Sequence, residues 1–513
     1  MAVTHEIEWK FAVEETFTLP AFDGVRGVAS VADRDERHLD AVYYDTDDLR
    51  LARNRLTLRR REGGADEGWH LKIPAADGAR DEIGRPLGEP SQIPPELLDL
   101  VAVRLRGARL RPVVSITTVR RTRRLRDAAG HDLVEVADDR VNARTMGERT
   151  IVSRWREVEL EVLDPAGVDV LPAASKALHR AGARPSPSPS KLQRALALAV
   201  DLGAPDVQPG PARLTAADSA ARVVHAYLAE HTAALLDRDP AVRVDAPEAV
   251  HDMRVAARRL RSTIQTFRPL FDPERAAAIE AGLREIGDVL GRPRDAEVQL
   301  ARFAGELAGQ PVDLVFGPVA ARLQEALLGE RLRSREEALA YLRGERYLGF
   351  VETLLAFVAD AAAGQTERAR RPAGTVLAKP VGKADRRLTR RVDRARRATA
   401  GSDRDAAYHG ARKAAKRLRY ACELMIPVHG GAAAKLAREA KRVQDTLGEH
   451  QDCVVAQTRL REFAVAANLA GESSFTYGLL AGDERARAAA TRAAFDATWA
   501  QASRPRHRHW LRG

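Results

Sequence analysis

Hydrophobic and polar residues alternate one by one through roughly the first 165 positions of the chain. This pattern predicts β-strands, because successive side chains of a strand point to opposite faces of a sheet. Gly, Asp and Pro separate the runs, and helical patterns interrupt them at 95–103, 172–181 and 191–201. The predicted strands span 6–11, 41–44, 56–61, 69–73, 113–121, 133–136 and 156–163.

The rest of the chain has a different period. From about residue 213 onward, apolar residues recur every three or four positions among Ala, Leu, Arg and Glu, which predicts an all-α region. Residues 203–211 contain three prolines and two glycines and mark a boundary. We therefore predict a multidomain α+β protein with domains at 1–202 and 213–513, joined by a linker at 203–212.

A basic motif occurs twice in the helical region. The pattern His-x-x-Arg-x-x-x-Arg/Lys-Arg-x-Arg begins at His251 and again at His409, and each copy is followed by Leu-Gly-x-x-x-Asp. The period of about 158 residues is too long for a solenoid unit, so each copy should be a helical bundle of its own. We place the two repeats at about 213–365 and 375–505.

Each basic motif should form a cationic face on a helix, because steps of three and four return to the same side. The residues on this face are His251, Arg254, Arg258 and Arg261, then His409, Arg412, Lys416 and Arg419. Arg259, Lys413 and Arg417 lie at its margin, and an apolar stripe runs beside it. Stacked cations repel one another, so the face suits an anionic ligand, although a solvated charged face is the simpler alternative.

Bulk properties narrow the class of protein. A chain of 513 residues is too long for one core, and 83 Lys and Arg against 72 Asp and Glu favour polyanionic partners. Two cysteines and no long apolar segment argue for a cytoplasmic protein without a disulfide framework or a membrane span. Aromatic residues make up only 5% of the chain, which disfavours specific nucleic-acid binding through base stacking.

Acidic residues share one face on the first and last long predicted strands. Glu6 and Glu8 alternate with apolar residues near the N-terminus, and the run from Glu157 to Glu161 places three more acids on one face. If a closed sheet brings these strands together, their oxygens form a site suited to Mg²⁺ or Mn²⁺. The alternative is an open sheet with cross-strand ion pairs on its solvent face.

The strand region resembles the CYTH superfamily of triphosphate tunnel enzymes. The resemblance rests on Glu6-Ile-Glu-Trp-Lys10 and on the later Leu58-Arg-Arg-Arg, Leu71-Lys72, Asp138 and Glu157-Val-Glu-Leu-Glu, and it covers roughly residues 3 to 200. It implies an eight-stranded antiparallel barrel around a triphosphate, with catalysis at Glu6, Glu8, Lys10 and Glu159. The implied metal ligands are Glu6, Glu8, Glu157, Glu159 and Glu161, and the implied phosphate ligands are Lys10, Arg59, Arg61, Lys72, Arg121 and Lys191.

The helical region is similar to the CHAD domain, a helical family with recurring histidines and basic residues that binds inorganic polyphosphate. This resemblance covers roughly residues 213 to 505 and rests on both basic motifs. Together the two resemblances imply metal-dependent hydrolysis of inorganic triphosphate, polyphosphate binding and an association with polyphosphate granules. The alternatives are a catalytically weak or inactive polyphosphate-binding protein, thiamine triphosphatase activity and adenylate cyclase chemistry. The oligomeric state stays open.

Overall fold

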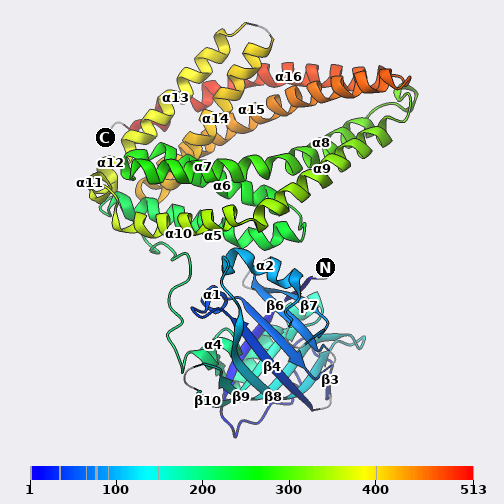
Figure 1. Cartoon of the computed structure of the whole chain (residues 1–513), viewed down its shortest axis with the longest axis vertical. Coiled ribbons are helices and arrows are strands. Elements are labelled where there is room, and N and C mark those ends of the chain that lie inside the picture. The colour runs from blue at the N-terminus through cyan, green and yellow to red at the C-terminus, as the bar shows by residue number, and fades with distance from the viewer. Residues whose placement is uncertain are drawn as a thin grey trace. The chain divides into compact units, whose positions relative to one another are not determined.

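The computed structural model describes residues 3–33, 36–64, 66–75, 79–89, 92–147, 150–399 and 401–511. The chain divides into two compact units, Met1–Asp206 and Val207–Gly513 (Figure 1). Strands dominate the first unit and helices make up the second.

The first unit contains one antiparallel sheet. Its strands are β1 (Val3–Glu6), β2 (Glu8–Val13), β3 (Ser30–Asp33), β4 (Arg37–Asp45), β5 (Thr57–Glu62), β6 (Gly68–Pro74), β7 (Arg80–Arg85), β8 (Arg111–Arg126), β9 (Asp132–Thr145), β10 (Val152–Val162) and β11 (Arg184–Pro185). Its helices are α1 (Arg50–Arg53), α2 (Pro95–Leu105), α3 (Leu171–Arg180) and α4 (Lys191–Leu196).

The sheet closes on itself through its first strand. The strand order is β1-β7-β6-β5-β4-β8-β9-β10-β2-β11, with β3 paired to β8. β1 and β2 therefore lie near opposite ends of this order, yet only Ile7 separates them along the chain. If β1 and β2 are taken as one interrupted strand, eight long strands surround an interior, with β3 and β11 as short additions. The predicted closed antiparallel barrel is confirmed.

Alternation along β10 decides which side chains enter the barrel. Val158 and Leu160 are fully buried in a cluster with Leu171 and Leu178 of α3, which covers the outside of these strands. The intervening Glu157 and Glu159 must therefore point to the interior. Helix α4 packs its apolar side against residues of β4, β8 and β9 and brings Lys191 to the barrel.

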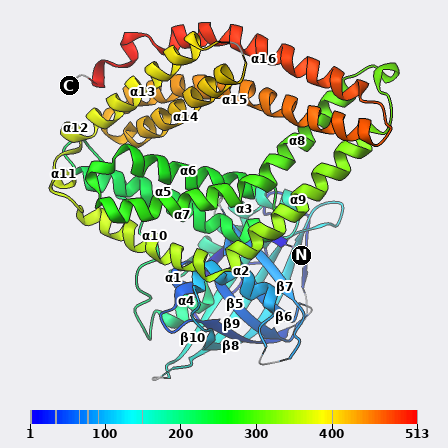
Figure 2. The same cartoon turned by 45° about the horizontal axis from the view of Figure 1, so that its top comes forward.

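The second unit is entirely helical apart from turns and loops. Its α-helices are α5 (Ala220–Arg243), α6 (Ala249–Thr266), α7 (Pro273–Val289), α8 (Gly291–Ala308), α9 (Val319–Arg343), α10 (Glu345–Ala363), α11 (Glu367–Arg370), α12 (Ala373–Val376), α13 (Ala378–Arg397), α14 (Ser402–Leu424), α15 (Ile426–Leu469) and α16 (Phe475–Ala502). Figure 2 shows α5–α10 in green shades and α13–α16 in yellow to red as two groups of helices. The predicted duplicated helical architecture is confirmed.

The two basic motifs lie on helices that contact each other, α6 and α14. Arg259 of α6 forms an ion pair with Glu423 of α14 at 3.1 Å. Reciprocally, Arg417 of α14 donates a hydrogen bond to Gln265 of α6. Each residue lies 158 positions from its counterpart, so the contact between the repeats is approximately two-fold symmetric.

Candidate functional site

The barrel interior is a cavity lined mainly by charged side chains. It brings together Glu6, Glu8, Glu159 and Glu161 of the predicted acidic set. The full lining is Glu6, Glu8, Lys10, Leu39, Ala41, Tyr43, Thr57, Arg59, Arg61, Asp66, Lys72, Arg80, Glu82, Ile116, Thr118, Arg120, Glu159, Glu161, Ser190 and Lys191. The interior therefore offers both carboxylates for a cation and cations for an anion.

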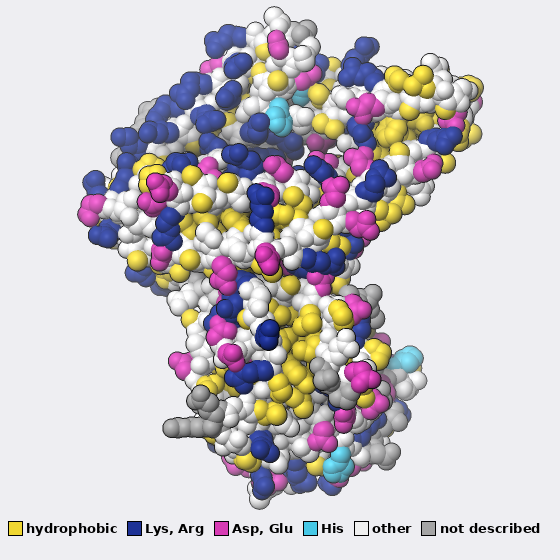
Figure 3. Space-filling view, in the orientation of Figure 1, with side chains coloured by type: hydrophobic (Ala, Val, Ile, Leu, Met, Phe, Trp, Pro, Cys, Tyr) yellow, Lys and Arg dark blue, Asp and Glu magenta, His cyan; other side chains and the backbone are white. Residues whose placement is uncertain are grey.

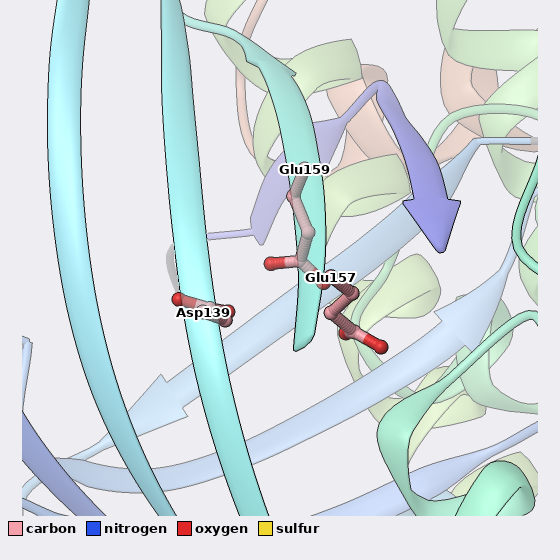
Figure 4. Close-up of side chains that lie close together, drawn as sticks. All are labelled: Asp139, Glu157 and Glu159. Atoms are coloured by element: carbon pink, nitrogen blue, oxygen red, sulfur yellow. The ribbon is translucent and has the colours of Figure 1, made fainter. Parts of the chain in front are cut away.

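One acidic cluster is already neutralised by a lysine. Asp139 of β9 and Glu157 and Glu159 of β10 each offer an oxygen, and these oxygens lie within 4.8 Å of one another (Figure 4). The Lys191 ammonium lies 2.8 Å from Asp139, 2.8 Å from Glu157 and 2.7 Å from Glu159. Burial opposes its charge, but the three carboxylates raise the pKa of Lys191 well above its usual value. A protein ammonium thus pairs with all three carboxylates.

Glu159 has cations on both of its oxygens. Its Oε1 pairs with Lys10 and Lys191, and its Oε2 accepts from Arg120 at 2.7 Å. Burial favours the neutral acid, but these cations hold the pKa of Glu159 well below its usual range. The geometry supports Glu157 and Glu159 as anchors for cationic side chains more directly than as metal ligands.

A second acidic group is less well neutralised and fits a divalent cation better. Glu8 of β2 lies directly opposite Glu161 of β10, and like charges in that position destabilise a sheet unless something neutralises them. The Glu8 Oε2 atom pairs with Lys10 at 2.9 Å, whereas its Oε1 atom is buried without a hydrogen-bond partner, 3.7 Å from Arg80. Burial raises the pKa of Glu161, for which the described residues supply no ion-pair partner. Carboxylate oxygens of this kind suit Mg²⁺ or Mn²⁺.

Glu6 lines the same cavity as Glu8 and Glu161. It pairs with Lys72 of β6 and hydrogen-bonds Glu82 of β7. Burial and then the Glu82 contact raise the pKa of Glu6 to about 8, which Lys72 only partly offsets. The contact between Glu6 and Glu82 therefore favours the protonated form of Glu6.

The predicted phosphate-binding cations divide into two groups. Lys10, Arg59, Arg61, Lys72 and Lys191 all line the cavity. Burial, and then Arg59 and Arg120, lower the pKa of Arg61, which also pairs with Asp66. An anion between them would relieve the repulsion.

Arg121 does not lie with these cations, and its predicted place in the tunnel is wrong. Its side chain is 63% exposed and pairs with Glu36 at 2.6 Å. The neighbouring Arg120 takes the inward position, where it contacts Asp139 at 2.6 Å. Arginines occupy both phases of the run from Arg120 to Arg124, so alternation alone could not choose between them.

Sequence reasoning also missed four charged side chains at this site. Asp139 is the neighbour of Asp138, the residue on which the resemblance rested, and the carboxylate of Asp138 instead pairs with Arg156. Arg120 was missed because alternation alone does not show which arginines of the run from Arg120 to Arg124 point into the barrel. Arg80 and Glu82 belong to β7, which contains one large apolar residue, Ile83, and therefore lacks an alternating pattern.

In the helical unit, the apolar stripe beside each basic motif is buried as predicted. Met253, Ala257, Leu260 and Ile264 are at most 1% exposed, as are their counterparts Ala411, Ala415, Leu418 and Cys422. The cations on the adjacent face remain partly exposed. No carboxylate of the described residues pairs with Arg258, Arg261, Arg412 or Lys416. These four cations are therefore available to an external anion.

Crowding of these cations is strongest where the repeats meet. Arg258 of α6 donates to the Tyr420 hydroxyl of α14 at 3.1 Å. Burial, and then Arg258 and Arg412, lower the pKa of Lys416 to about 7. Burial also lowers the pKa of His409, helped by Lys413, and that of His251, helped by Arg294. Cations of both repeats thus act on one another across a single surface.

The Leu-Gly-x-x-x-Asp motif supports this surface. Arg254 pairs with Asp295 at 3.2 Å and donates to the Gly291 carbonyl at 3.3 Å. A side chain at Gly448 would begin 3.5 Å from the Arg412 guanidinium, the corresponding contact in the second repeat. Each glycine therefore leaves room for the first arginine of the basic motif.

Arg419 is not free like its counterpart Arg261. It pairs with Glu423 at 2.6 Å and lies over the Tyr420 ring at 5.5 Å. Glu423 replaces the Gln265 of the first repeat. Arg419, one of the eight predicted polyphosphate ligands, is thus neutralised by the carboxylate of Glu423.

The fold defines a two-domain protein in which a charged antiparallel tunnel precedes a duplicated helical unit. A family model for the CYTH domain matches residues 4–196, and one for the CHAD domain matches residues 226–461. The Mycobacterium tuberculosis (strain ATCC 25618 / H37Rv) protein named Uncharacterized protein Rv2226 is 38% identical over 493 residues, covering 93% of this chain and 92% of that protein. The chain belongs to the family of CYTH–CHAD domain proteins.

Solved structures resemble the two parts separately. The CHAD domain from the plant Ricinus communis is 25% identical, covering 58% of this chain and 96% of its own, with a TM-score of 0.45. HpAC1 from Hippeastrum, described as revealing a dominant triphosphatase activity, is 18% identical, covering 39% of this chain and all of its own, with a TM-score of 0.26. Among the described residues, no helix has the length and apolar character needed to cross a bilayer.

Proposed function

We propose that the tunnel hydrolyses inorganic triphosphate to diphosphate and phosphate with the help of a divalent metal. The observation that carries this proposal is the composition of one closed cavity. Glu8 lies directly opposite Glu161, for which the described residues supply no ion-pair partner, and Arg59, Arg61 and Arg120 line the same cavity. A metal-bound oligophosphate would neutralise both groups at once.

The carboxylates of the tunnel would have two different roles, metal binding and the positioning of cations. Glu6, Glu8 and Glu161 would hold Mg²⁺ or Mn²⁺, which supplies charge neutralisation of the phosphate oxygens when bound. Glu157, Glu159 and Asp139 hold Lys191, while Glu159 also contacts Lys10 and Arg120. Their role is to fix the cations that face the substrate, so Glu159 acts here as a positioning residue.

The cations hold the substrate in line for attack. Arg59, Arg61, Lys72, Arg80 and Arg120 would each contact phosphate oxygens, and arginine suits this because its planar fork can bind two oxygens. A water attacks the terminal phosphorus, the bond from that phosphorus to the bridging oxygen breaks, and diphosphate leaves with the electron pair. The water loses its proton to solvent or to a nearby carboxylate. Positioning and electrostatics supply most of the acceleration in such reactions.

A binding tunnel without catalysis is the second candidate. The saturation of Glu159 by Lys10, Lys191 and Arg120 favours it, because this carboxylate offers no free oxygen to a metal or water. A phosphate-release assay separates the two candidates. It would use triphosphate, longer polyphosphates, thiamine triphosphate and ATP, each with and without Mg²⁺ or Mn²⁺. Metal-dependent release from triphosphate supports the first, and an inert protein that still binds triphosphate supports the second.

The same assay tests related tunnel chemistries. Faster hydrolysis of thiamine triphosphate than of triphosphate would reassign the substrate. Conversion of ATP to a cyclic nucleotide with release of diphosphate would reassign the reaction. We expect inorganic triphosphate to be preferred, because most of the side chains that line the cavity are charged.

We propose further that the helical unit binds inorganic polyphosphate across α6 and α14. The support is the set of unpaired cations from both repeats, Arg258, Arg261, Arg412 and Lys416. The double variant Arg258→Gln/Arg412→Gln should bind long polyphosphate at least tenfold more weakly, since charge-assisted hydrogen bonds are worth roughly 1.5–3 kcal/mol each. Arg485→Gln, an exposed position on α16, is the control. Stronger competition by single-stranded RNA than by polyphosphate at matched salt would contradict the proposal.

A further inference from the structure

The two repeats differ sharply in the groove beside their basic helices. In the first repeat, this groove is lined by α5, by the segment 207–214 and by the junction of α14 and α15, next to Arg259 of α6. In the second, it lies between α13 and α14, next to the equivalent Arg417. Duplication should make the two grooves alike, so their differences show where one repeat has acquired a separate property.

The first groove is largely apolar and its charge is balanced. Ala226, Ala233 and Leu424 are among its lining residues. Glu423 pairs with Arg259 at 3.1 Å and accepts from the Tyr227 hydroxyl at 3.3 Å. Helix α5 itself carries three arginines and three acidic residues, so it contributes no net charge.

The second groove is lined by four cations and three small residues. The cations are Arg387 and Arg391 of α13 and Lys413 and Arg417 of α14, and the small residues are Ala406, Gly410 and Ala414. Helix α13 carries nine Lys and Arg against two Asp. Figure 3 shows Lys and Arg side chains gathered over this part of the helical unit.

The four cations have no carboxylate to neutralise them. Among the described residues, none lies within ion-pairing distance of Arg387, Arg391, Lys413 or Arg417. Arg417 donates instead to the neutral Gln265, which stands where the other groove has Glu423. Burial, and then Arg387, lower the pKa of Arg417, as expected for cations that repel one another in a confined space.

The small residues create the space that an anion would fill. Gly410 corresponds to Asp252 of α6, which pairs with Arg238 of α5 at 3.2 Å. At Gly410 there is no side chain, and the Arg391 stem and guanidinium lie 3.7–3.8 Å from where a Cβ would stand. Lys413 likewise replaces Val255 of the first repeat. The second repeat thus has an added cation where the first has an apolar side chain, and an open position where the first has an acid.

We propose that the groove between α13 and α14 is an accessory polyphosphate subsite that extends the shared α6–α14 surface in one direction only. This inference rests on the proposed polyphosphate binding of the helical unit. Lys416 of the shared surface and Arg417 of the groove are consecutive residues, so one flexible chain can contact both. The polyphosphate surface is therefore asymmetric, although the fold that carries it is duplicated.

Inorganic polyphosphate fits the groove better than other polyanions. Neither α13 nor the groove lining contains an aromatic residue on which a nucleic-acid base could stack. The floor of the groove consists of small residues, which leaves no protruding apolar side chain to enter a membrane interface. A chain made only of phosphates needs closely spaced cations and nothing else, and this is what the groove provides.

A matched pair of double variants on α13 tests the subsite. Arg387→Gln/Arg391→Gln removes two cations from the groove. Arg386→Gln/Arg390→Gln removes two exposed cations from the same helix that do not line the groove. Both changes lower the net charge equally, and Gln has a helix propensity close to that of Arg. Affinity of the full chain for long inorganic polyphosphate would be measured at several salt concentrations, with circular dichroism to confirm equal helix content.

The groove variant should lose roughly tenfold or more in affinity, and its salt dependence should fall by roughly two released counterions. The control variant should lose less than about threefold. Equal losses in both variants, or no loss in the groove variant, would overturn the subsite. If the wild type itself fails to bind polyphosphate, both the subsite and the proposed function fail. If Arg258→Gln/Arg412→Gln abolishes binding while the groove variant binds normally, only the subsite fails.

Discussion

The ammonium of Lys191 should be essential for barrel stability, and Lys191→Met tests this. The substitution keeps most of the side-chain length but removes the charge that pairs with Asp139, Glu157 and Glu159 at 2.7–2.8 Å. The Lys191 side chain is only 9% exposed, so solvent cannot replace it. Removing one partner of a buried ion pair costs about 3–5 kcal/mol. Here the loss leaves three buried carboxylates with fewer cations, since Lys10 and Arg120 remain beside Glu159 and Arg120 beside Asp139.

This cost predicts a large thermal shift. For a domain of this size, about 1 kcal/mol shifts the melting temperature by roughly 2–4 °C, so the barrel should melt about 6–20 °C lower at pH 7.5. Differential scanning calorimetry of the full chain would follow the barrel transition, and the transition of the helical unit should not move. Lys176→Met, at an exposed position on α3, is the control and should change stability by less than about 0.5 kcal/mol.

The pH dependence of the stability difference between variant and wild type tests the same prediction independently. In the wild type, burial opposes ionisation of Asp139 and Glu159, but nearby cations hold the pKa of each below its ordinary value. That contribution is present above the ordinary carboxyl pKa of about 4 and is lost as the pH falls. In the variant, the contribution of Lys191 is lost, so the pKa of each carboxyl group is higher than in the wild type and protonation begins to relieve the repulsion at a higher pH. The stability difference should therefore shrink between pH 7.5 and pH 5. A barrel transition within about 2 °C of the wild type at pH 7.5, or a difference that grows at pH 5, would refute the reasoning.

Three further predictions concern the two surfaces. Polyphosphate affinity should fall as the pH rises above 7, by up to about tenfold per pH unit, because the pKa of Lys416 is about 7 in the free protein and a bound polyanion raises it. In a binding titration, Lys416→Arg should make the affinity less dependent on pH, because arginine stays charged. Gly448→Leu should displace the Arg412 guanidinium and weaken polyphosphate binding roughly tenfold, whereas Gly448→Ala, with its Cβ at 3.5 Å, and Gly482→Leu, in open space on α16, should bind normally. Chelation of divalent cations should abolish phosphate release from triphosphate without weakening polyphosphate binding. Unchanged phosphate release together with weaker polyphosphate binding would contradict a metal site in the tunnel.

Alternation predicted most of the barrel because its strands bury one face against helices. On β10, Val158 and Leu160 had to enter the outer core, which placed Glu157 and Glu159 inside. On β7, Ile83 is the only buried residue, since the remaining side chains face the charged cavity or are partly exposed. A strand with so few buried apolar residues shows no alternation of hydrophobic and polar positions. For that reason β7 was not predicted from the sequence.

The sequence did not predict which residues would pair with the charged side chains. Glu159 read as a metal ligand because three acids alternate on one strand, but Lys191 arrives from α4 and pairs with it. On the helices, the buried stripe fixed which face was cationic. Whether a cation there is free depends on one substitution between the repeats, Gln265 against Glu423, whose effect on Arg259 and Arg419 appears only when α6 and α14 are packed together.

Metal-dependent phosphate release by Glu8→Gln tests the central claim most directly. Glu8 has a buried oxygen without a hydrogen-bond partner and lies directly opposite Glu161 on the neighbouring strand, so neutralising Glu8 should weaken metal binding. We predict that Glu8→Gln loses at least about 100-fold in Mg²⁺-dependent release of phosphate from triphosphate, while Glu14→Gln, at an exposed position after β2, keeps wild-type activity. A Glu8→Gln enzyme that hydrolyses triphosphate at the wild-type rate would contradict the proposed tunnel chemistry.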